Sequence, residues 1–281
     1  MNNKIVSKNI IGEFSNTRII KMEIQAPLIA EHYKPGQFVI LMVEEKGERI
    51  PLTITEIDLN KKTISLIFQE VGFTTKLLGA LKEGDVLYHI VGPLGKPTEI
   101  KNYGTVVLIG GGVGTAEVYP IAKALKKEKN RIITIIGARN KNLVILEEEF
   151  EKLSDELYIT TDDGSYGEKG FVSDILKKLI NQKIKIDLVY AVGPIPMMKV
   201  VSEITKPYNI KTIVSLNTIM IDGTGMCGSC RITYEGKIKY VCCDGPEFDG
   251  HKVDWEEIIE RNKTYLKQEE YILKSCSFNH I

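Results

Sequence analysis

The sequence has no excess of charge of either sign and no long apolar run. Its 281 residues include 37 Lys plus Arg and 37 Asp plus Glu, so the net charge is zero. Such a chain offers no broad electrostatic attraction for nucleic acid or for an anionic membrane. No apolar stretch approaches the ~20 residues that cross a bilayer, and the start, MNNKIVSKNIIGEF, lacks the apolar run of a signal peptide. We therefore expect a cytoplasmic protein that binds neither nucleic acid nor membrane.

Cysteine is scarce and unevenly placed. There are five cysteines, of which four lie within residues 227–243 and the fifth, Cys276, stands near the end. Structural disulfides use an even number of cysteines spread through a secreted chain. A tight group of thiols in a chain without secretion signals indicates a metal site instead.

The order of patterns along the chain predicts an α/β plus β fold in three parts. Residues 1–100 hold short, nearly alternating apolar segments separated by turn signals, which is typical of an antiparallel β-barrel. Residues 101–217 alternate apolar strands with helical segments, one of them expected over residues 143–153, which predicts a doubly wound parallel sheet. Residues 218–281 are rich in Gly, Cys and Asp at first and continue as a polar tail with helical character.

A glycine-rich turn follows the first apolar strand of the second part, TVVLIG. The residues of interest are Gly110, Gly111, Gly112, Gly114 and Thr115. A strand, a glycine turn and a helix N-terminus together favour a bound phosphate, as in dinucleotide sites. A second turn, Gly193-Pro194, follows the strand DLVYAV and would lie at the same edge of the sheet. The second strand ends in Arg139 rather than in an acidic reader of the ribose 2′-hydroxyl, so Arg139 is either a partner for a 2′-phosphate or an exposed charge.

Two stretches in the first part suit an anion. One contains Arg49, Pro51, Leu52 and Thr53, and the other contains Gly72, Thr74 and Thr75. An arginine, hydroxyl groups and a helix start are apt for a pyrophosphate. An ordinary strand and an ordinary helix cap at Thr74 explain the same residues.

The third part carries the thiols. Cys227 and Cys230 form a C-x-x-C pair, and Cys242-Cys243 follow after eleven residues. Thiolates bind soft metals, and nearby glycines allow the positive φ angles of a loop wrapped around a cluster. A [2Fe–2S] cluster needs four ligands. Three could be Cys227, Cys230 and one of the pair Cys242-Cys243, and the candidates for the fourth are Asp222, Asp244 or the other member of that pair. A structural zinc site made of the same residues is the alternative.

These motifs together resemble the ferredoxin–NADP reductase superfamily over essentially the whole chain. Arg49–Thr53 resembles the family's R-x-P-x-T flavin motif, and Gly72, Thr74 and Thr75 resemble its pyrophosphate-binding helix start. GPLGKP at residues 92–97 is similar to its domain junction. The resemblance implies bound FAD and NAD(H) or NADP(H). Val192 stands where many members have a cysteine before the Gly-Pro turn, so no thiol is expected beside the nicotinamide.

Within the superfamily, the third part is similar to a subgroup of electron-transfer subunits. This subgroup includes those of dihydroorotate dehydrogenases and the small subunits of NADH-dependent ferredoxin:NADP oxidoreductases. The resemblance implies a [2Fe–2S] cluster held by Asp222, Cys227, Cys230 and Cys242, with Cys243 unligated. Asp222 stands where the subunits of dihydroorotate dehydrogenases have their first cluster cysteine, which favours the small subunits of the ferredoxin:NADP oxidoreductases. NADH is the nucleotide implied, although Arg139 leaves NADPH open.

The resemblance also implies an oxidoreductase subunit that works in a heterodimer. Its partner would be a larger iron–sulfur flavoprotein subunit, through which ferredoxin takes part indirectly in electron bifurcation. The first alternative is an electron-transfer subunit of dihydroorotate dehydrogenase. A non-catalytic zinc or nucleotide-binding redox adaptor is the second.

Overall fold

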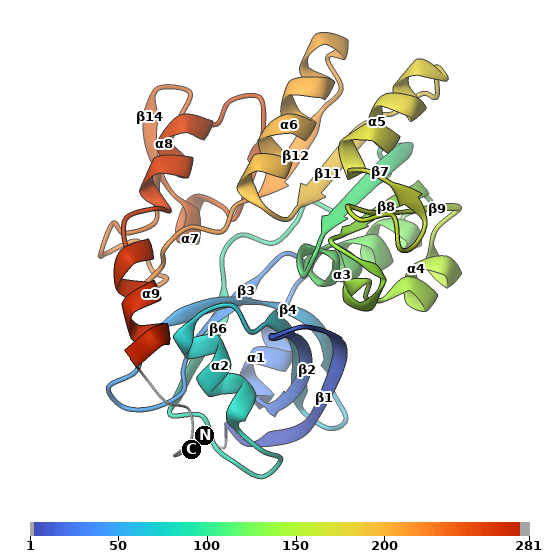
Figure 1. Ribbon diagram of the computed structural model, residues 1–281. Coiled ribbons are helices and arrows are strands. Elements are labelled where there is room, and N and C mark those ends of the chain that lie inside the picture. Colours follow the sequence, from blue (N-terminus) through green and yellow to red (C-terminus); the bar gives the residue numbers. More distant parts are fainter. Residues whose placement is uncertain (1–2, 276–281) are drawn as a thin grey trace.

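The computed structural model describes residues 3–275, so Cys276 lies outside the described residues. An antiparallel sheet lies below a mainly parallel sheet with helices on both faces, and the C-terminal segment runs down one side of both (Figure 1). The parallel α/β character of the second part and the antiparallel character of the first are as the sequence predicts. Within residues 3–275, no helix is long and apolar enough to cross a membrane.

The first sheet has six antiparallel strands in the order β1-β2-β5-β4-β3-β6. The strands are β1 (Ile5–Phe14), β2 (Thr17–Gln25), β3 (Phe38–Met42), β4 (Ile50–Asp58), β5 (Thr63–Gln69) and β6 (His89–Leu94). The sheet curls so far that Lys4, before β1, forms an antiparallel bridge with Val86, before β6. Side chains from all six strands or their flanks fill one apolar cluster inside the curl.

Two helices accompany this sheet, α1 (Pro27–His32) and α2 (Phe73–Ala80). The second begins where the sequence analysis expected a helix start, at Gly72, Thr74 and Thr75, and it ends at Ala80. The first was not expected, because its six residues are too short for a helical period, although Pro27 at its first position is a start signal.

The second sheet has seven strands in the order β10-β9-β8-β7-β11-β12-β15. They are β7 (Thr105–Gly111), β8 (Arg131–Ala138), β9 (Glu156–Thr161), β10 (Glu168–Lys169), β11 (Leu188–Val192), β12 (Thr212–Ser215) and β15 (Glu247–Asp249). All neighbours are parallel except β12 and β15. The chain moves outward from β7 in one direction through β8 and in the other through β11, so the strand order reverses between β7 and β11.

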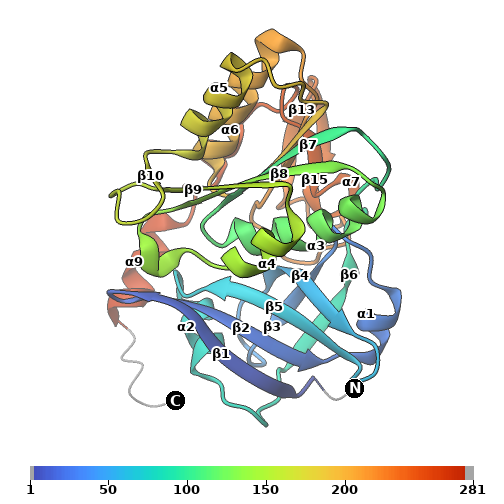
Figure 2. The same cartoon turned by 90° about the vertical axis from the view of Figure 1, so that its right-hand side faces the viewer.

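Helices cover both faces of this sheet (Figure 2). They are α3 (Gly114–Lys127), α4 (Glu147–Leu153), α5 (Val172–Asn181) and α6 (Ile195–Thr205). Alternate residues of β7 serve the two faces: Val106 and Leu108 pack with α3 and α4, whereas Val107 and Ile109 pack with α5 and α6. The continuous apolar run TVVLIG is therefore explained by burial on both sides.

The helix expected over residues 143–153 is shorter than predicted. Lys141–Leu143 form a 3₁₀ turn, and α4 begins only at Glu147. Val144 is extended, and Leu146 has a left-handed backbone with φ 59°, so the chain cannot continue as a helix there. The apolar side chains of residues 143–146, which favoured a helix, pack instead against the parallel sheet with α3 and against β2 and β5 of the first sheet.

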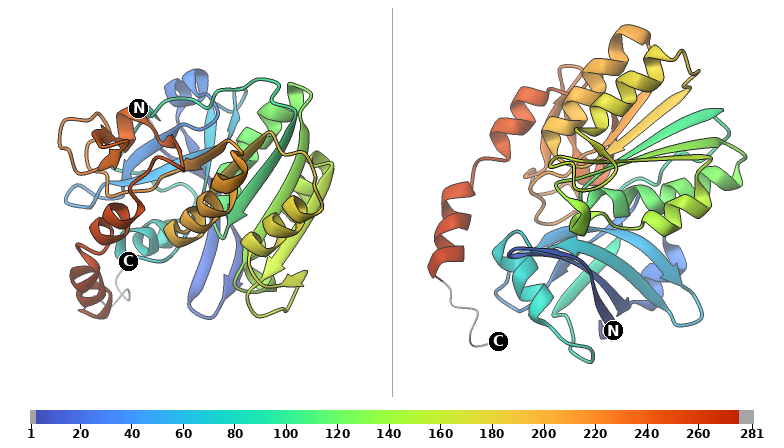
Figure 3. Two further views of the ribbon diagram at one scale, coloured as in Figure 1. Left: turned by 90° about the horizontal axis from the view of Figure 1, so that it is seen from above. Right: turned by 45° about the vertical axis from the view of Figure 1, so that its right-hand side comes forward.

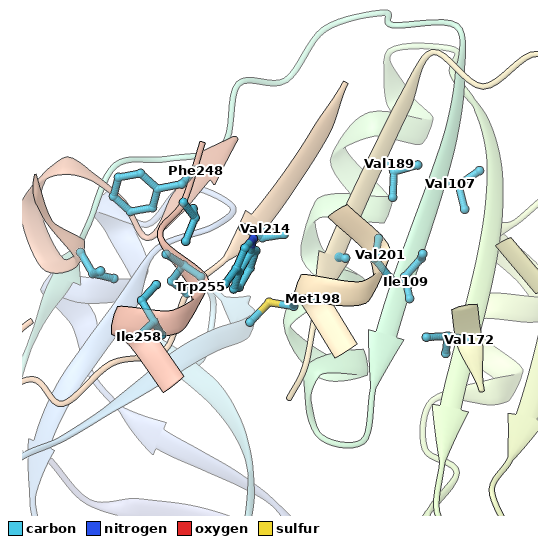
Figure 4. Packing of buried hydrophobic residues seen from close by; sticks show 14 of the residues in the cluster. Val107, Ile109, Val172, Val189, Met198, Val201, Val214, Phe248, Trp255 and Ile258 are labelled. Atoms are coloured by element: carbon cyan, nitrogen blue, oxygen red, sulfur yellow. The ribbon is translucent and has the colours of Figure 1, made fainter. Parts of the chain in front are cut away.

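The C-terminal segment shares a core with the parallel sheet. It contains the hairpin β13 (Arg231–Tyr234) and β14 (Lys237–Tyr240), then α7 (Val241–Asp244), β15, α8 (Trp255–Arg261) and α9 (Leu266–Ser275). Phe248, Trp255 and Ile258 from this segment join Met198 and Val214 in one apolar cluster (Figure 4). Helix α9 then descends beside α2 of the first sheet (Figure 3). The boundaries at residues 100 and 217 remain predictions.

Candidate functional site

The two glycine turns of the second part meet at the point where the strand order reverses. A methyl group on Gly114 would lie 2.4 Å from the carbonyl oxygen of Val192, and one on Gly193 would lie 3.0 Å from the Cα of Gly111. Any larger residue at these positions would push the start of α3 away from the end of β11. In open α/β sheets, the crevice at such a reversal is where ligands bind.

The start of α3 has the features of an anion site. No side chain caps its N-terminus, and Gly112 has φ +57° with open space where a side chain would stand. The Thr115 hydroxyl is buried without a hydrogen-bond partner among the described residues. A buried hydroxyl left unpaired costs about 1–3 kcal/mol, so a ligand that paired with it would be favoured. These residues therefore fit a nucleotide phosphate.

Arg139 lies exposed just after β8, where the sequence placed it. The turn after β9 runs beside it, since the N–H of Asp163 donates to the Arg139 carbonyl at 3.3 Å. Hydrogen bonds from Ser165 hold the pKa of the Asp163 carboxyl below its usual value. The turn that holds Asp162 and Asp163, which the sequence analysis did not single out, therefore runs beside the backbone of Arg139.

The two stretches of the first part that suit an anion are brought together. Thr74, in the first turn of α2, donates a hydrogen bond to the Glu48 carboxylate, and Glu48 directly precedes the exposed Arg49. Gly72 caps α2 with open space around it. The Thr75 hydroxyl accepts from the N–H of Gly72 at 3.0 Å, so this side chain already serves the helix cap.

The remaining residues of the arginine motif lie on β4. Pro51, Leu52 and Thr53 pair with Ile40, Val39 and Phe38 of β3. Thr53 is half-buried, and its hydroxyl lowers the pKa of Glu117, in the first turn of α3, against the rise that burial causes. The strand that carries the arginine motif, β4, packs against the glycine-turn helix α3.

The cysteine loop has the backbone that its glycines predict. Gly223, Gly225 and Gly228 all have positive φ angles, of 75°, 85° and 70°. Asp222 organises the loop, because its carboxylate accepts from the N–H of Thr224 at 2.8 Å and from the N–H of Cys227 at 2.7 Å. The N–H of Thr224 is the main cause that lowers the pKa of Asp222 below its usual value.

The four expected ligands form two pairs. Cys230 and Cys242 are buried, with their sulfurs 3.3 Å apart, close to the roughly 3.8 Å expected for two thiolates on one tetrahedral ion with bonds of ~2.3 Å. Asp222 and Cys227 are joined by hydrogen bonds. Burial and the neighbouring sulfurs raise the pKa of Cys242. Across residues 3–275, no three His, Cys, Asp or Glu side chains gather around a single point as one ion would require.

Cys243 is placed differently from Cys242. It is exposed, and its sulfur lies 3.6 Å from that of Cys242. A methyl group on Gly225 would stand 2.9 Å from the Cys243 sulfur. His251, whose role the sequence left open, bonds through Nε2 to the Thr205 hydroxyl at 2.8 Å. That bond ties the turn after β15 to the end of α6, which is a structural role.

The cysteine loop also lies on the first sheet. A methyl group on Gly223 would stand 2.7 Å from the Cδ1 atoms of Ile40 and Leu94, on β3 and β6. Ile40 in turn pairs with Pro51 of the arginine motif. The cysteine loop, the arginine motif and the glycine turn are thus neighbours in space, although they are far apart in the sequence.

Known protein families match two of these regions. The iron–sulfur cluster binding domain of dihydroorotate dehydrogenase B matches residues 217–254, and the oxidoreductase NAD-binding domain matches residues 108–203. The dihydroorotate dehydrogenase B (NAD(+)) electron transfer subunit homolog of Thermotoga maritima is 47% identical over 267 residues, or 95% of this chain and 93% of the relative. The electron transfer subunit of Fusobacterium nucleatum is 34% identical, covering 84% of this chain and 93% of its own. The chain belongs to the family of dihydroorotate dehydrogenase B electron transfer subunits and their homologues.

Solved structures place this family member in the same fold. A chain from the structure of an NADH-dependent reduced ferredoxin-NADP oxidoreductase, described for its insights into flavin-based electron bifurcation, matches with a TM-score of 0.91 and 46% identity. The match covers 98% of this chain and 97% of that one. Ferredoxin-NADP+ reductase from Plasmodium falciparum has a TM-score of 0.57 at 15% identity, covering 73% and 89%, and shares the fold. The resemblance to this superfamily, predicted from motifs, is confirmed.

Proposed function

We propose that this electron transfer subunit homologue passes electrons between NAD(H), an FAD on the first sheet and a [2Fe–2S] cluster in the C-terminal segment, and from there to a larger iron–sulfur flavoprotein subunit. The observation that carries the proposal is the convergence of the three candidate sites. The strand β4, which holds Pro51 and Thr53, packs against α3, and Gly223 packs on Ile40 beside Pro51. Electron transfer between bound groups requires such proximity.

The nucleotide would be held at the reversal point of the parallel sheet. We assign its phosphates to Gly110, Gly111, Gly112, Gly114 and Thr115, with Gly193-Pro194 forming the opposite wall. The close contact between Gly111 and Gly193 supports this crevice. Arg139 would lie at the ribose end of the nucleotide, beside the turn that holds Asp162 and Asp163.

The flavin would be held by the curled first sheet, acting as the flavin barrel. We assign its contacts to Arg49, Pro51, Leu52, Thr53, Gly72, Thr74 and Thr75. Glu48 would have to release Thr74 to leave that hydroxyl free for a pyrophosphate. When bound, the flavin accepts two electrons together and releases them one at a time, while the protein orients it.

The cluster ligands proposed are Asp222, Cys227, Cys230 and Cys242. The two pairs of donors, Cys230 with Cys242 and Asp222 with Cys227, would suit the four protein ligands of a binuclear cluster. One zinc ion would instead need four donors around one point. The match of residues 217–254 to an iron–sulfur cluster binding domain also supports iron rather than zinc.

Two kinds of larger subunit are candidates for the partner. The 98% coverage and 46% identity to the ferredoxin-NADP oxidoreductase chain favour the partner of that enzyme. The names of the curated relatives favour a dihydroorotate dehydrogenase. Isolation of the native complex followed by mass spectrometry of the larger subunit distinguishes them.

The ligand assignment is tested by a matched pair of variants, Cys242→Ser and Cys243→Ser. These neighbouring cysteines differ in burial, and only Cys242 approaches Cys230. Cys243→Ser should keep the iron and acid-labile sulfide of the unmodified protein, whereas Cys242→Ser should lose most of both. The reverse pattern would assign the ligand to Cys243, and two iron-free variants or two unaffected ones would contradict the proposed ligand set.

A further inference from the structure

The two residues between the cysteines of the C-x-x-C pair are held by arginines from outside the loop. The guanidinium of Arg261, the last residue of α8, donates to the carbonyl oxygen of Ser229 at 2.9 Å. The guanidinium of Arg231, the first residue of β13, donates to the carbonyl oxygen of Gly228 at 3.4 Å. Neither arginine forms an ion pair with a carboxylate among residues 3–275. Both positive charges therefore face the loop without a counter-charge.

Helix α8 lies against the hairpin of β13 and β14 and gives Arg261 a fixed origin (Figure 1). The carboxylate of Glu257 on α8 accepts from the N–H of Thr233 on β13 at 2.6 Å, and the apolar side chains of α8 are buried. Because β13 begins directly after Cys230, the helix and the C-x-x-C pair are anchored to the same hairpin. Ser229 is thus held through its own carbonyl and through its buried neighbour Cys230.

The side chain of Ser229 is directed at a proposed cluster ligand. Its hydroxyl lies 3.1 Å from Sγ of Cys227 and has no other hydrogen-bond partner among the described residues. In a free thiol either atom can donate, but a sulfur that binds iron has lost its proton, so Ser229 must then be the donor. The sulfurs of Cys230 and Cys242 lie beside other sulfurs and, within the described part of the chain, beside no hydroxyl.

We propose that Ser229 raises the reduction potential of the cluster by donating a hydrogen bond to Sγ of Cys227, and that Arg261 positions Ser229 for this bond. The inference rests on the proposed function, because it requires iron on Cys227. A hydrogen bond to a charged acceptor is stronger than one to a neutral acceptor, and one-electron reduction makes the cluster and its sulfurs more negative. Hydrogen bonds to the sulfurs are among the factors that set the potential of such clusters. The bond from Ser229 therefore favours the reduced state.

Ser229→Ala tests this bond in the full chain carrying FAD and cluster, with Thr224→Val as the matched control. Each substitution removes one hydroxyl from the cysteine loop. The hydroxyl of the exposed Thr224 bonds to none of the residues that the structure describes, and the N–H that Thr224 donates to Asp222 remains in the control.

Redox titrations followed by EPR should distinguish the two variants. At a given potential, Ser229→Ala should lower the ratio of reduced to oxidised cluster by about tenfold, which is a fall of about 59 mV in the midpoint potential of a one-electron couple. In Thr224→Val the ratio should stay within about twofold of the unmodified protein.

Resonance Raman spectra separate the hydrogen bond from a structural effect. A donor on Sγ of Cys227 withdraws electron density from the sulfur and weakens its bond to iron. The terminal Fe–S stretching bands should therefore move to higher frequency in Ser229→Ala and stay in place in Thr224→Val. An unchanged potential or unchanged bands in Ser229→Ala, with iron and sulfide bound, would overturn the inference alone. Absence of iron and sulfide from the unmodified protein would overturn the proposed function as well.

A second pair of variants covers the case in which Ser229→Ala loses its iron. Ser229→Thr and Ser229→Val add nearly the same bulk, so a disturbance of packing is common to both, and only threonine keeps a hydroxyl. A higher midpoint potential in Ser229→Thr than in Ser229→Val is the expected result. Equal midpoint potentials in this pair would refute the hydrogen bond.

A double-mutant cycle tests the positioning role of Arg261. Arg261→Met removes both the positive charge and the bond to the Ser229 carbonyl, whereas the loss of charge alone acts whether or not Ser229 is present. Arg261→Met should therefore lower the midpoint potential more in the unmodified protein than in Ser229→Ala. Equal falls in the two backgrounds would show that Arg261 acts by its charge alone and would overturn its positioning role.

Discussion

Replacing Gly223 by alanine should disturb the cysteine loop more than any backbone preference alone can explain. Gly223 has φ +75°, and a left-handed backbone costs a residue with a Cβ about 1–2 kcal/mol. The added methyl would also lie 2.7 Å from the Cδ1 atoms of Ile40 and Leu94, and overpacking of this kind costs about 1–3 kcal/mol. The two contributions together predict a loss of about 2–5 kcal/mol in the free energy of unfolding.

Gly236 provides the matched control. It lies in the hairpin between β13 and β14 with φ +72°, and nothing stands within 4 Å of where its methyl would be. Gly236→Ala should therefore lose only the backbone contribution, about 1–2 kcal/mol. Urea unfolding of both variants, with iron content measured on the folded proteins, gives the comparison. Iron should fall in Gly223→Ala, because Asp222 is displaced with its neighbour. Equal stability losses and equal iron contents would refute the packing of this loop on the first sheet.

Three further predictions concern the other parts of the site. Gly79→Ala should lower stability by about 1–3 kcal/mol and weaken FAD binding, because its methyl would lie 1.8 Å from the carboxylate of Glu70, which pairs with Arg18 at 2.6 Å. Urea unfolding and flavin titration measure the two effects, and unchanged values would contradict this packing. The raised pKa of Glu117, about 7 against an ordinary 4.5, favours the folded state at low pH, so the cofactor-free protein should lose stability relative to Glu117→Gln as pH rises from about 5 to 8. This loss is at most about 3 kcal/mol. If the unmodified protein and Glu117→Gln differed in free energy of unfolding by the same amount at every pH, Glu117 would not be desolvated. NADH should reduce the flavin faster than NADPH in stopped-flow experiments, because the turn beside the backbone of the exposed Arg139 carries the acidic residues Asp162 and Asp163. Faster reduction by NADPH would show that Arg139 binds a 2′-phosphate.

Local patterns were enough to predict the parts of the site that lie on single elements. TVVLIG followed by glycines predicted β7 and the start of α3, because a buried strand and a tight turn leave a direct mark on composition. The glycines of the cysteine loop likewise predicted its positive φ angles. Leu146 shows the limit of such patterns, since its left-handed backbone stopped a helix that the apolar spacing favoured.

The contacts between elements could not be predicted in this way. Glu117 lies on α3 and Thr53 on β4 of the first sheet, and a lone glutamate in a helix is ordinarily a solvated side chain. Glu247 meets Tyr190 only because β15 returns to pair with β12, far from its neighbours in sequence. Such pairings depend on how the parts dock, which leaves no periodic signal in the chain.

The central claim is that one chain carries electrons from a nicotinamide nucleotide through a flavin to a binuclear iron cluster. Anaerobic reduction of the purified chain by NADH, followed by visible and EPR spectra with flavin, iron and sulfide assays, tests it most directly. The account predicts about one flavin, two irons and two sulfides per chain, with bleaching of the flavin and a rhombic EPR signal after NADH is added. A colourless protein that contains zinc and no flavin would contradict it.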